Sequence, residues 1–311
     1  NMDFNHIPVL LNECINGLNI NPNGVYFDGT LGGGGHSLEI AKRLTGGRLI
    51  CVDKDAEAIL FAGERLKEYR DKITFVHDDF KNAERILEKA GVDKLDGVLL
   101  DLGVSSYQID NSERGFSYIK DAPLDMRMNQ DQYLTAFNVV NEYSVAKLER
   151  IIAEYGEDKF ARRIAERIAA VRAKESIRTT AELAKIVEDC YPPSVRWKFG
   201  HPAKRTFQAI RIEVNGELDE LYGTVEFLAK SLKVGGRIAI ISFHSLEDRI
   251  VKNCFKELET DCICDKSLPK CVCGKRREIK ILNKKPITAS EEELQANSRA
   301  ESAKLRVAER V

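Results

Sequence analysis

The residues from Val25 to Ser37, VYFDGTLGGGGHS, constrain the fold of this chain more than any other stretch. An apolar run that suits a buried strand is followed by a turn with four consecutive glycines, and a helical pattern continues from Ser37 to Leu44. Glycines let a ligand approach the backbone closely, and the free N–H groups at the start of a helix attract polar ligands. The stretch therefore predicts the strand, turn and helix of a nucleotide-binding crevice.

The residues around the glycines exclude two common loops. A phosphate-binding Walker loop ends in Gly-Lys-Ser/Thr, but histidine and serine occupy that place, and a dinucleotide loop has its first glycine where Asp28 stands. Asp28-x-Thr30-x-Gly32-x-Gly34 instead resembles the acid-x-Gly-x-Gly-x-Gly loop of S-adenosylmethionine-dependent methyltransferases, with Thr30 replacing the first glycine. Such an acid can help to orient the methionine end of the cofactor. A plain tight turn is the alternative.

A second apolar run, residues 47–53, ends at Asp53, about 20 residues after the glycine turn, where a ribose-binding acid is expected. A carboxylate at this place can accept hydrogen bonds from both ribose hydroxyls. Because a nicotinamide cofactor uses a similar acid, Asp53 alone does not choose the cofactor.

Two more strands are predicted at residues 73–77 and 95–101. Asp79 and Phe80 follow the first and would meet adenine, although a turn with a core phenylalanine is the alternative. The second ends at Asp101, which we expect to face the reaction site. Strands that alternate with helices predict an α/β protein with a doubly wound, Rossmann-like parallel sheet and its ligand at the carboxyl edge.

The next buried strand is predicted only at residues 237–243, far beyond the dozen or so residues that a parallel crossover needs. We expect a crossover helix over residues 217–233 and a last strand at the sheet edge near the C-terminus. The division predicted is a discontinuous cofactor-binding domain, residues 1–106 and 213–311, and an inserted, mainly helical substrate-recognition domain, residues 107–212.

The predicted inserted domain ends in a stretch that mixes basic and aromatic residues. Residues 190–212 contain no acidic residue. The basic and aromatic side chains of the stretch are Arg196, Trp197, Lys198, Phe199, Lys204, Arg205, Phe207 and Arg211. Cations that neutralise phosphates beside rings that stack on bases suit single-stranded or loop RNA. A solvated basic face with core aromatics is the alternative.

The segment before this domain's helices contains residues 115–118, with Phe116 and Tyr118, and residues 123–128. Polar and aromatic residues without a helical period predict an ordered loop, either a lid or a pocket for a base.

The eight cysteines form two groups. Cys14, Cys51, Cys190 and Cys254 stand singly among apolar residues, as reduced core cysteines do. Two Cys-x-Cys pairs follow later, and they comprise Cys262, Cys264, Cys271 and Cys273. They could close a four-thiolate zinc site, which would be structural, although the better-known zinc knuckles use two-residue spacers. We expect no catalytic metal.

The net charge and the hydropathy of the chain limit which kinds of partner we expect it to bind. A formal net charge of -1 gives no overall signature of nucleic-acid binding, so such a partner depends on local patches. No stretch of about 18 uncharged apolar residues and no signal-peptide pattern occurs. We expect a cytoplasmic protein without membrane or DNA partners, and the sequence carries no signal for an oligomeric state.

Several long motifs together resemble those of the bacterial MraW family, the small-subunit ribosomal RNA methyltransferase H group. The motifs are Asp28–Thr30 with Gly33–Ser37, Asp101–Ser106, Arg114–Ser117, Pro123–Met128, His201–Ala209 and Ile241–Arg249. The resemblance implies transfer of a methyl group from S-adenosylmethionine to N4 of a cytidine in the decoding region of 16S rRNA. It implies a cofactor site lined by Gly34, Gly35, His36, Asp53, Phe80, Asp101 and Gln108. The cysteine cluster resembles one that only some relatives have.

Methylation of an exocyclic amine requires a group that accepts a hydrogen bond from it. Amino methyltransferases often use Asp/Asn-Pro-Pro-aromatic after the fourth strand, but here Asp101 is followed by Leu-Gly-Val. Our hypothesis is that Asp101, Ser105 or Ser106 orients the amine and that Phe116 or Tyr118 stacks on the base.

Three other functions stay open at this point. A methyltransferase of the same fold could act on a protein or a small molecule, and the basic aromatic stretch would then be irrelevant. A cofactor-sensing RNA-binding factor without catalytic turnover would have both the cofactor site and the RNA-binding stretch. A nicotinamide-dependent dehydrogenase fits the glycine turn least well.

Overall fold

The computed structural model describes residues 7–198 and 200–311, so the prediction for Phe199 lies outside the described residues. The chain divides into two compact units. Unit 1 runs up to Gly103 and resumes at Glu220, and unit 2 comprises residues 104–219. The sequence-based division ended the first part of unit 1 at residue 106, three residues too late, and resumed it at residue 213, seven residues too early. The second difference arises because residues 216–219, which follow the last helix of unit 2, still belong to unit 2.

Unit 1 contains one seven-stranded sheet, in the order β3-β2-β1-β4-β5-β7-β6. The strands are β1 (Val25–Asp28), β2 (Arg48–Asp53), β3 (Ile73–His77), β4 (Leu95–Asp101), β5 (Leu232–Ser242), β6 (Ile279–Ile281) and β7 (Lys304–Arg310). The first five are parallel, and β7 is antiparallel to both of its neighbours. The strand order reverses between β1 and β4, which is the switch point where open α/β sheets bind ligands. The predicted fold class is confirmed.

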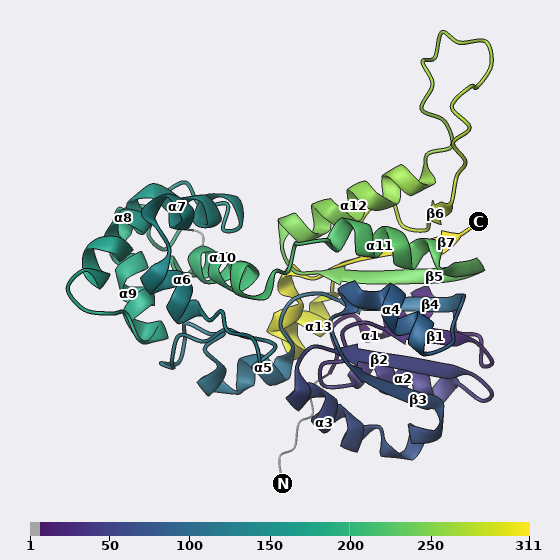
Figure 1. The fold of residues 1–311 in the computed structure, drawn as a ribbon, viewed down its shortest axis with the longest axis horizontal. Coiled ribbons are helices and arrows are strands. Elements are labelled where there is room, and N and C mark those ends of the chain that lie inside the picture. The colour runs from purple at the N-terminus through teal and green to yellow at the C-terminus, as the bar shows by residue number, and fades with distance from the viewer. Residues whose placement is uncertain (1–6, 199) are drawn as a thin grey trace. The chain divides into compact units, whose positions relative to one another are not determined.

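Helices cover both faces of this sheet (Figure 1). The α-helices of unit 1 are α1 (Leu11–Leu18), α2 (Gly35–Arg43), α3 (Ala56–Arg65), α4 (Ala83–Lys89), α11 (Leu221–Lys230), α12 (Ser245–Glu259) and α13 (Glu291–Ala296), and its 3-10 helices are η1 (Lys67–Lys72), η2 (Phe80–Asn82) and η4 (Ser298–Ser302). One face contacts α1, α2 and α3, which share a core cluster with the strands. On the other face, α11 contacts α4, α12 and β5.

The crossover into β5 differs from the prediction. The helix begins at Leu221, because Glu220 lies in the left-handed region with φ 57°, and it ends at Lys230. Strand β5 begins at Leu232, five residues before the predicted strand, because the N–H of Leu95 donates to the Ser231 carbonyl and draws the chain into the sheet. Expecting one helix from residue 217 to residue 233 was therefore wrong at both ends.

Two further features of unit 1 depend on its tertiary structure. Leu60 of α3 is 75% exposed although it is apolar, because Ala58 and Ala62 face the core instead. The last strand was expected at the sheet edge, yet β7 lies between β5 and β6, and the three residues of β6 form the edge.

Unit 2 is helical. Its elements are α5 (Ser106–Asp110), η3 (Ser112–Arg114), α6 (Ala136–Glu142), α7 (Val145–Glu154), α8 (Ala161–Arg172), α9 (Thr180–Cys190) and α10 (Lys204–Asn215). Ser144 caps α7, and Thr179 with Glu182 forms the capping box of α9, a pattern that the sequence Thr-x-x-Glu itself indicates. The apolar stripes of α6 to α10 join in one buried core, as the helical spacing predicts.

Among the residues that the structure describes, no helix is both long enough and apolar enough to cross a membrane.

A buried ion pair fixes the antiparallel strand β7 to helix α12. Arg306 of β7 donates to both carboxylate oxygens of Asp248 in the first turn of α12, at 2.7 and 3.0 Å, and their side chains are 10% and 12% exposed. Removing one partner of such a pair leaves a buried charge without compensation.

We therefore expect Arg306→Met to lower the free energy of unfolding by about 3 kcal/mol, measured by urea denaturation. The matched control is Arg43→Met, which removes an exposed helical ion pair with Glu39 and should cost less than about 1 kcal/mol. Equal losses in the two variants would contradict this role of the buried pair.

Candidate functional site

The carboxyl ends of β1, β2 and β4 place three acids, Asp28, Asp53 and Asp101, on one edge of the unit 1 sheet. The glycine turn follows β1 and leads into α2. Because this edge includes the switch point between β1 and β4, it is where the fold itself predicts a ligand.

Asp28 holds the glycine turn. Its residue is 1% exposed, and its oxygens accept hydrogen bonds from the N–H of Thr30 at 3.0 Å and the hydroxyl of Ser37 at 2.6 Å. Burial raises the pKa of Asp28 to about 6 against the opposing effect of these hydrogen bonds. These contacts give Asp28 a structural role in the turn, and its orientation of the methionine end of the cofactor stays a prediction.

The hydroxyl of Thr30 continues the network by accepting the backbone N–H of Asp101 at 2.6 Å. The residue that replaces the first glycine of the usual loop thus joins the end of β1 to the end of β4. A glycine could not make this bond, since it has no side chain.

The glycines of the turn serve different purposes. Gly34 has φ 78° and precedes the first residue of α2, a conformation that L-residues rarely adopt. A Cβ on Gly35 would lie 2.2 Å from Cγ of Pro8, whereas a Cβ on Gly33 would find its nearest neighbours at 3.9 Å. Gly34 is therefore required by its backbone conformation and Gly35 by packing, whereas Gly33 is required by neither; Gly32, with φ 50°, also lies in the left-handed region.

Asp53 has the geometry of a ribose-binding acid. Its Oδ2 accepts the N–H of Gly32 at 2.8 Å, and its Oδ1 accepts the N–H of Asp55 at 2.9 Å. Burial raises the pKa of Asp53 to about 6. Each carboxylate oxygen keeps a lone pair for a further donor, so the residue can still accept from two hydroxyls.

Phe80 begins η2 directly after β3 and is partly exposed. A Cβ on Gly29 would lie 2.9 Å from the Phe80 Cβ, so the backbone of this residue approaches the glycine turn closely. The side chain of Asp79 accepts the N–H of Lys81 at 3.0 Å, which makes it the cap of η2.

Asp101 is the least compensated acid of the site. Its Oδ1 is buried without a hydrogen-bond partner, while Oδ2 lies 3.8 Å from Nδ1 of His36. Burial, followed by the negative charges of Asp28 and Glu247, raises the pKa of Asp101 to about 8. Such a carboxyl can give or take a proton near neutral pH.

His36 does not offset that charge. Its Nε2 lies 2.9 Å from the carbonyl of Val9, and burial lowers the pKa of the imidazole to about 4. The ring is therefore neutral at pH 7 with its proton on Nε2, the nitrogen that can donate to a carbonyl.

His244 caps α12. Its ring accepts the N–H of Glu247, and the Glu247 carboxylate, 1% exposed, accepts the N–H of Phe243 at 2.9 Å. The sequence analysis missed Glu247 as a charge that acts on Asp101, because 146 positions separate the two residues in the chain and only the pairing of β4 with β5 brings them together.

In unit 2, two predicted site residues form the N-terminal capping box of α5. The Ser105 hydroxyl accepts the N–H of Gln108 at 3.2 Å, and Gln108 Oε1 accepts the N–H of Ser105 at 3.0 Å. Gln108 is 4% exposed, and Ser106 is the first residue of the helix. These contacts give Ser105 and Gln108 a local structural role.

The aromatic residues of unit 2 gather around His201. The Tyr118 ring lies 4.4 Å from His201 and 5.5 Å from Phe207, and the Trp197 ring lies 5.2 Å from His201. Phe116 and Tyr118 pack against the helical core, whereas Trp197 is 57% exposed. Among the described rings of the basic aromatic stretch, Trp197 therefore has the most surface available to a base, and this stretch is where the sequence predicted base stacking.

The predicted basic residues have different environments. Lys204 and Arg205 are exposed in the first turn of α10. Arg196 donates to the carbonyl of Tyr191, and Arg211 is paired with Glu217 at 2.9 Å with its side chain 17% exposed.

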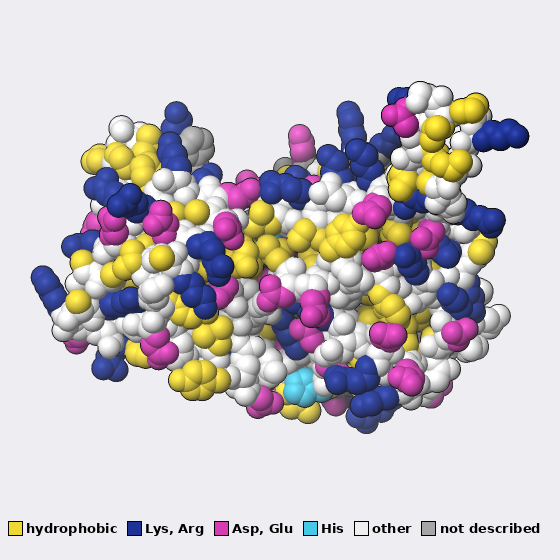
Figure 2. All heavy atoms as spheres, turned by 45° about the horizontal axis from the view of Figure 1, so that its top comes forward, with side chains coloured by type: hydrophobic (Ala, Val, Ile, Leu, Met, Phe, Trp, Pro, Cys, Tyr) yellow, Lys and Arg dark blue, Asp and Glu magenta, His cyan; other side chains and the backbone are white. Residues whose placement is uncertain are grey.

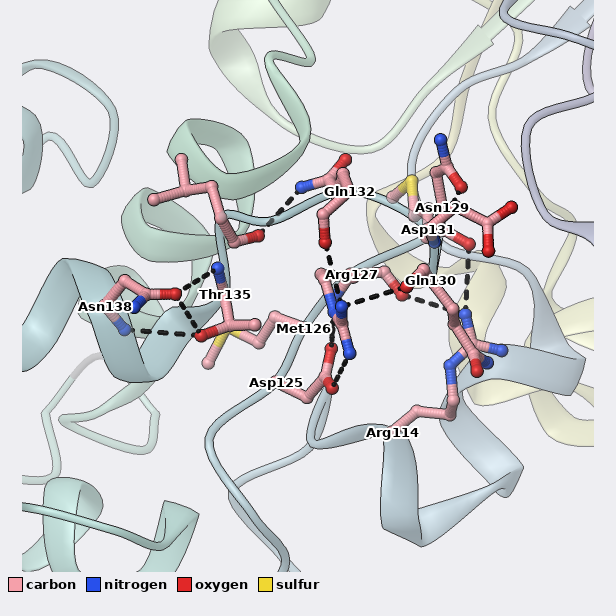
Figure 3. A network of polar contacts seen from close by, with 12 residues as sticks. Arg114, Asp125, Met126, Arg127, Asn129, Gln130, Asp131, Gln132, Thr135 and Asn138 are labelled. Atoms are coloured by element: carbon pink, nitrogen blue, oxygen red, sulfur yellow. Dashed lines mark hydrogen bonds and ion pairs between the residues drawn. The ribbon is translucent and has the colours of Figure 1, made fainter.

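The segment from Asp125 to Gln132 is an ordered loop, as predicted, held by a polar network (Figure 3). Arg127 makes two hydrogen bonds to the Asp125 carboxylate at 2.9 Å and donates to the carbonyls of Gln130 and Gln132. Met126 is 1% exposed in the unit 2 core. The many hydrogen bonds of this loop make it a rigid support for the helical core. A mobile lid would instead make few such contacts.

The model of the MraW methylase family matches residues 3–311 of this sequence. The chain belongs to the MraW methylase family. Relatives named "Ribosomal RNA small subunit methyltransferase H" are 53% identical in Lachnospira eligens, 54% in Clostridioides difficile and 55% in Clostridium botulinum. Each alignment covers all of this chain and at least 99% of the relative.

Membership of the methylase family confirms the resemblance, the methyltransferase class and, with it, S-adenosylmethionine as the cofactor.

The methylase should tolerate substitution of its glycines unequally. We expect Gly34→Ala to lower the free energy of unfolding by about 1–2 kcal/mol, because an L-residue would be forced into the left-handed region. Gly33→Ala is the matched control and should stay within about 0.5 kcal/mol of the wild type. Both values come from urea unfolding, and a Gly33→Ala loss as large as that of Gly34→Ala would contradict the geometry of the turn.

Proposed function

We propose that this protein transfers a methyl group from S-adenosylmethionine to the exocyclic N4 of a cytidine in the decoding region of 16S rRNA. The name of its relatives supports small-subunit ribosomal RNA as the substrate class. The observation that carries the choice of an amine is the buried, unpartnered Oδ1 of Asp101 beside the glycine turn.

The cytosine amine needs such a partner because its lone pair is delocalised into the ring. S-adenosylmethionine supplies an electrophilic methyl group on a positively charged sulfonium. Asp101 accepts a hydrogen bond from the amine and so orients its lone pair. As the nitrogen–carbon bond forms and the carbon–sulfur bond breaks with its electron pair on sulfur, the amine becomes acidic, and its proton passes to Asp101.

The cofactor is held by residues of unit 1. Asp53 accepts from the ribose hydroxyls, the backbone at Gly34 and Gly35 leaves room beside the start of α2, and Phe80 contacts the adenine. His36 lines the site as a neutral ring. Its Nε2–H is engaged with the Val9 carbonyl, so its contribution is shape rather than charge.

The assignment of the amine-holding group narrows to Asp101. The hydroxyl of Ser105 is engaged in the capping box with Gln108, and Ser106 is the first residue of α5. If Gln108 binds the cofactor, its side chain must contact the cofactor while its Oε1 still accepts the N–H of Ser105 in the capping box of α5. Of the three candidates for the amine, only Asp101 has an unpartnered buried acceptor.

RNA is bound by unit 2. Helix α10 starts without a side-chain cap and without an acid in its first turn, and instead Lys204 and Arg205 are exposed there. Cations at a helix N-terminus oppose the helix dipole, so they do not stabilise α10, but together with free N–H groups they suit a phosphate. Trp197 stacks on a base. Arg205 also donates to the carbonyl of Glu157 at 3.0 Å and stays exposed, whereas Arg196 and Arg211 are held by Tyr191 and Glu217.

The pH dependence of methyl transfer tests the role of Asp101. Because only the carboxylate can take a proton, kcat/KM should rise about tenfold per pH unit below the pKa of about 8 and level off above it. We expect Asp101→Asn to lower transfer by about 100-fold or more and to abolish this rise, while calorimetry finds the cofactor affinity unchanged.

The matched control is Asp93→Asn, an exposed acid that should leave both rate and pH profile unaltered. If Asp101→Asn lost cofactor affinity and transfer in equal measure, Asp101 would be a cofactor ligand and the proposed amine contact would be wrong.

Charge reversal tests the RNA surface. We expect Lys204→Glu with Arg205→Glu to raise KM for small subunits at least tenfold and to reduce the salt dependence of RNA binding, since each phosphate contact contributes about 0.7 to the slope on single strands. The reaction is followed with labelled S-adenosylmethionine, and nucleoside mass spectrometry identifies N4-methylcytidine.

Arg162→Glu with Lys174→Glu reverses two exposed charges elsewhere in unit 2 and serves as the control. Full activity of the Lys204/Arg205 variant would favour a protein or small-molecule substrate. Bound cofactor with no methyl group transferred, even in a single turnover, would favour a binding factor.

A further inference from the structure

The loop between α12 and β6 has no helix or strand of its own in residues 260–278 and no apolar core. Figure 1 shows it extending away from the sheet of unit 1. Its larger apolar side chains are exposed, with Ile263 at 70%, Leu268 at 46% and Val272 at 77%. Figure 2 shows hydrophobic side chains and Lys or Arg side chains together on the surface of the loop. Burial of apolar surface therefore does not hold this loop closed.

The four cysteine sulfurs meet inside this loop. Among the described residues, Cys262, Cys264, Cys271 and Cys273 form the single group of potential metal ligands detected, with all four sulfurs within 4.8 Å of one another. The Sγ–Sγ distances are 3.6 Å for Cys262–Cys271, 3.8 Å for Cys264–Cys271, 3.5 Å for Cys271–Cys273 and 3.9 Å for Cys262–Cys273. All four thiols are free.

These distances match a tetrahedral site. With Zn–S bonds of about 2.3 Å, the edge of a four-thiolate tetrahedron is about 3.8 Å. We propose that Cys262, Cys264, Cys271 and Cys273 bind one Zn²⁺ ion as a structural four-thiolate site that folds the loop. Nothing in the methyl-transfer chemistry uses this site, so the inference is independent of the proposed function.

Backbone N–H groups already point at three of the sulfurs. Cys264 N–H donates to the Cys262 sulfur at 3.4 Å, Ile263 N–H to Cys273 at 3.5 Å and Val272 N–H to Cys264 at 3.2 Å. Hydrogen bonds of this kind stabilise the thiolate form that binds metal and orient the ligands. They also explain how one-residue spacers suffice, because the intervening N–H groups of each pair turn inward.

The charges around the cysteines fit the net charge of such a centre. Four thiolates and one Zn²⁺ carry a net charge of -2, which requires positive charge nearby. Between residues 261 and 277 the two acidic residues are outnumbered by Lys266, Lys270, Lys275, Arg276 and Arg277. Without a metal, these basic residues would instead repel one another in a loop that has no core.

Metal content tests the proposal directly. We expect the reduced, full-length protein, purified without chelator, to contain one zinc ion per chain when its metal content is measured by inductively coupled plasma mass spectrometry. Replacement by Co²⁺ should give the visible bands and the thiolate charge-transfer bands of a tetrahedral four-sulfur site. Cys271→Ser should lose the zinc, whereas Cys254→Ala, which changes a buried cysteine outside the loop, should retain it.

Limited trypsin digestion provides a second readout that does not depend on a variant. The metal-loaded loop should resist cleavage after its lysines and arginines, and a strong chelator should expose them while the remainder of unit 1 stays intact. One zinc per chain retained in Cys271→Ser, an equal trypsin sensitivity with and without metal, or iron in place of zinc would each overturn the proposal.

Discussion

The hydrogen bonds to the Asp28 carboxylate are the constraint on which the site depends. They join the end of β1 to the N–H of Thr30 and to Ser37 in the first turn of α2. The Thr30 hydroxyl extends the connection to the backbone of Asp101 at the end of β4. The glycine turn is therefore fixed at both ends, and its glycines can leave open backbone beside the switch point of the sheet. A cofactor that binds there meets a preorganised loop.

The same edge of unit 1 concentrates negative charge in a poorly solvated place. Burial raises the pKa of Asp28 and Asp53 to about 6 and that of Asp101, together with the charges of Asp28 and Glu247, to about 8. Acids whose folded-state pKa is raised stabilise the fold below their unfolded pKa, and this contribution is lost as the pH rises through the folded value. A cationic ligand reverses that penalty, because a positive charge nearby favours the carboxylates. The raised pKa values of these acids are therefore compatible with a positively charged ligand at this edge.

Different interactions make the two units rigid, and the loop after α12 needs yet another interaction to hold its shape. Unit 1 relies on the pairing of parallel strands and on the buried pair between Arg306 and Asp248. Unit 2 combines a helical core with the polar network around Arg127, which fixes the chain before α6. The loop after α12 has neither device, and a metal bound by its cysteines would supply the missing centre.

Much of this protein follows from local sequence patterns. The glycine turn, the acids that end β1, β2 and β4, and the capping box at Thr179 could be predicted, because each depends on residues a few positions apart. Only the tertiary structure decided that Asp28 turns inward, that Leu60 is exposed, that β7 lies between β5 and β6, and that Arg211 pairs with Glu217. It also brought Glu247 close enough to raise the pKa of Asp101. Which side chain is buried or paired depends on neighbours that folding brings together from distant parts of the chain, and a local pattern carries no information about those neighbours.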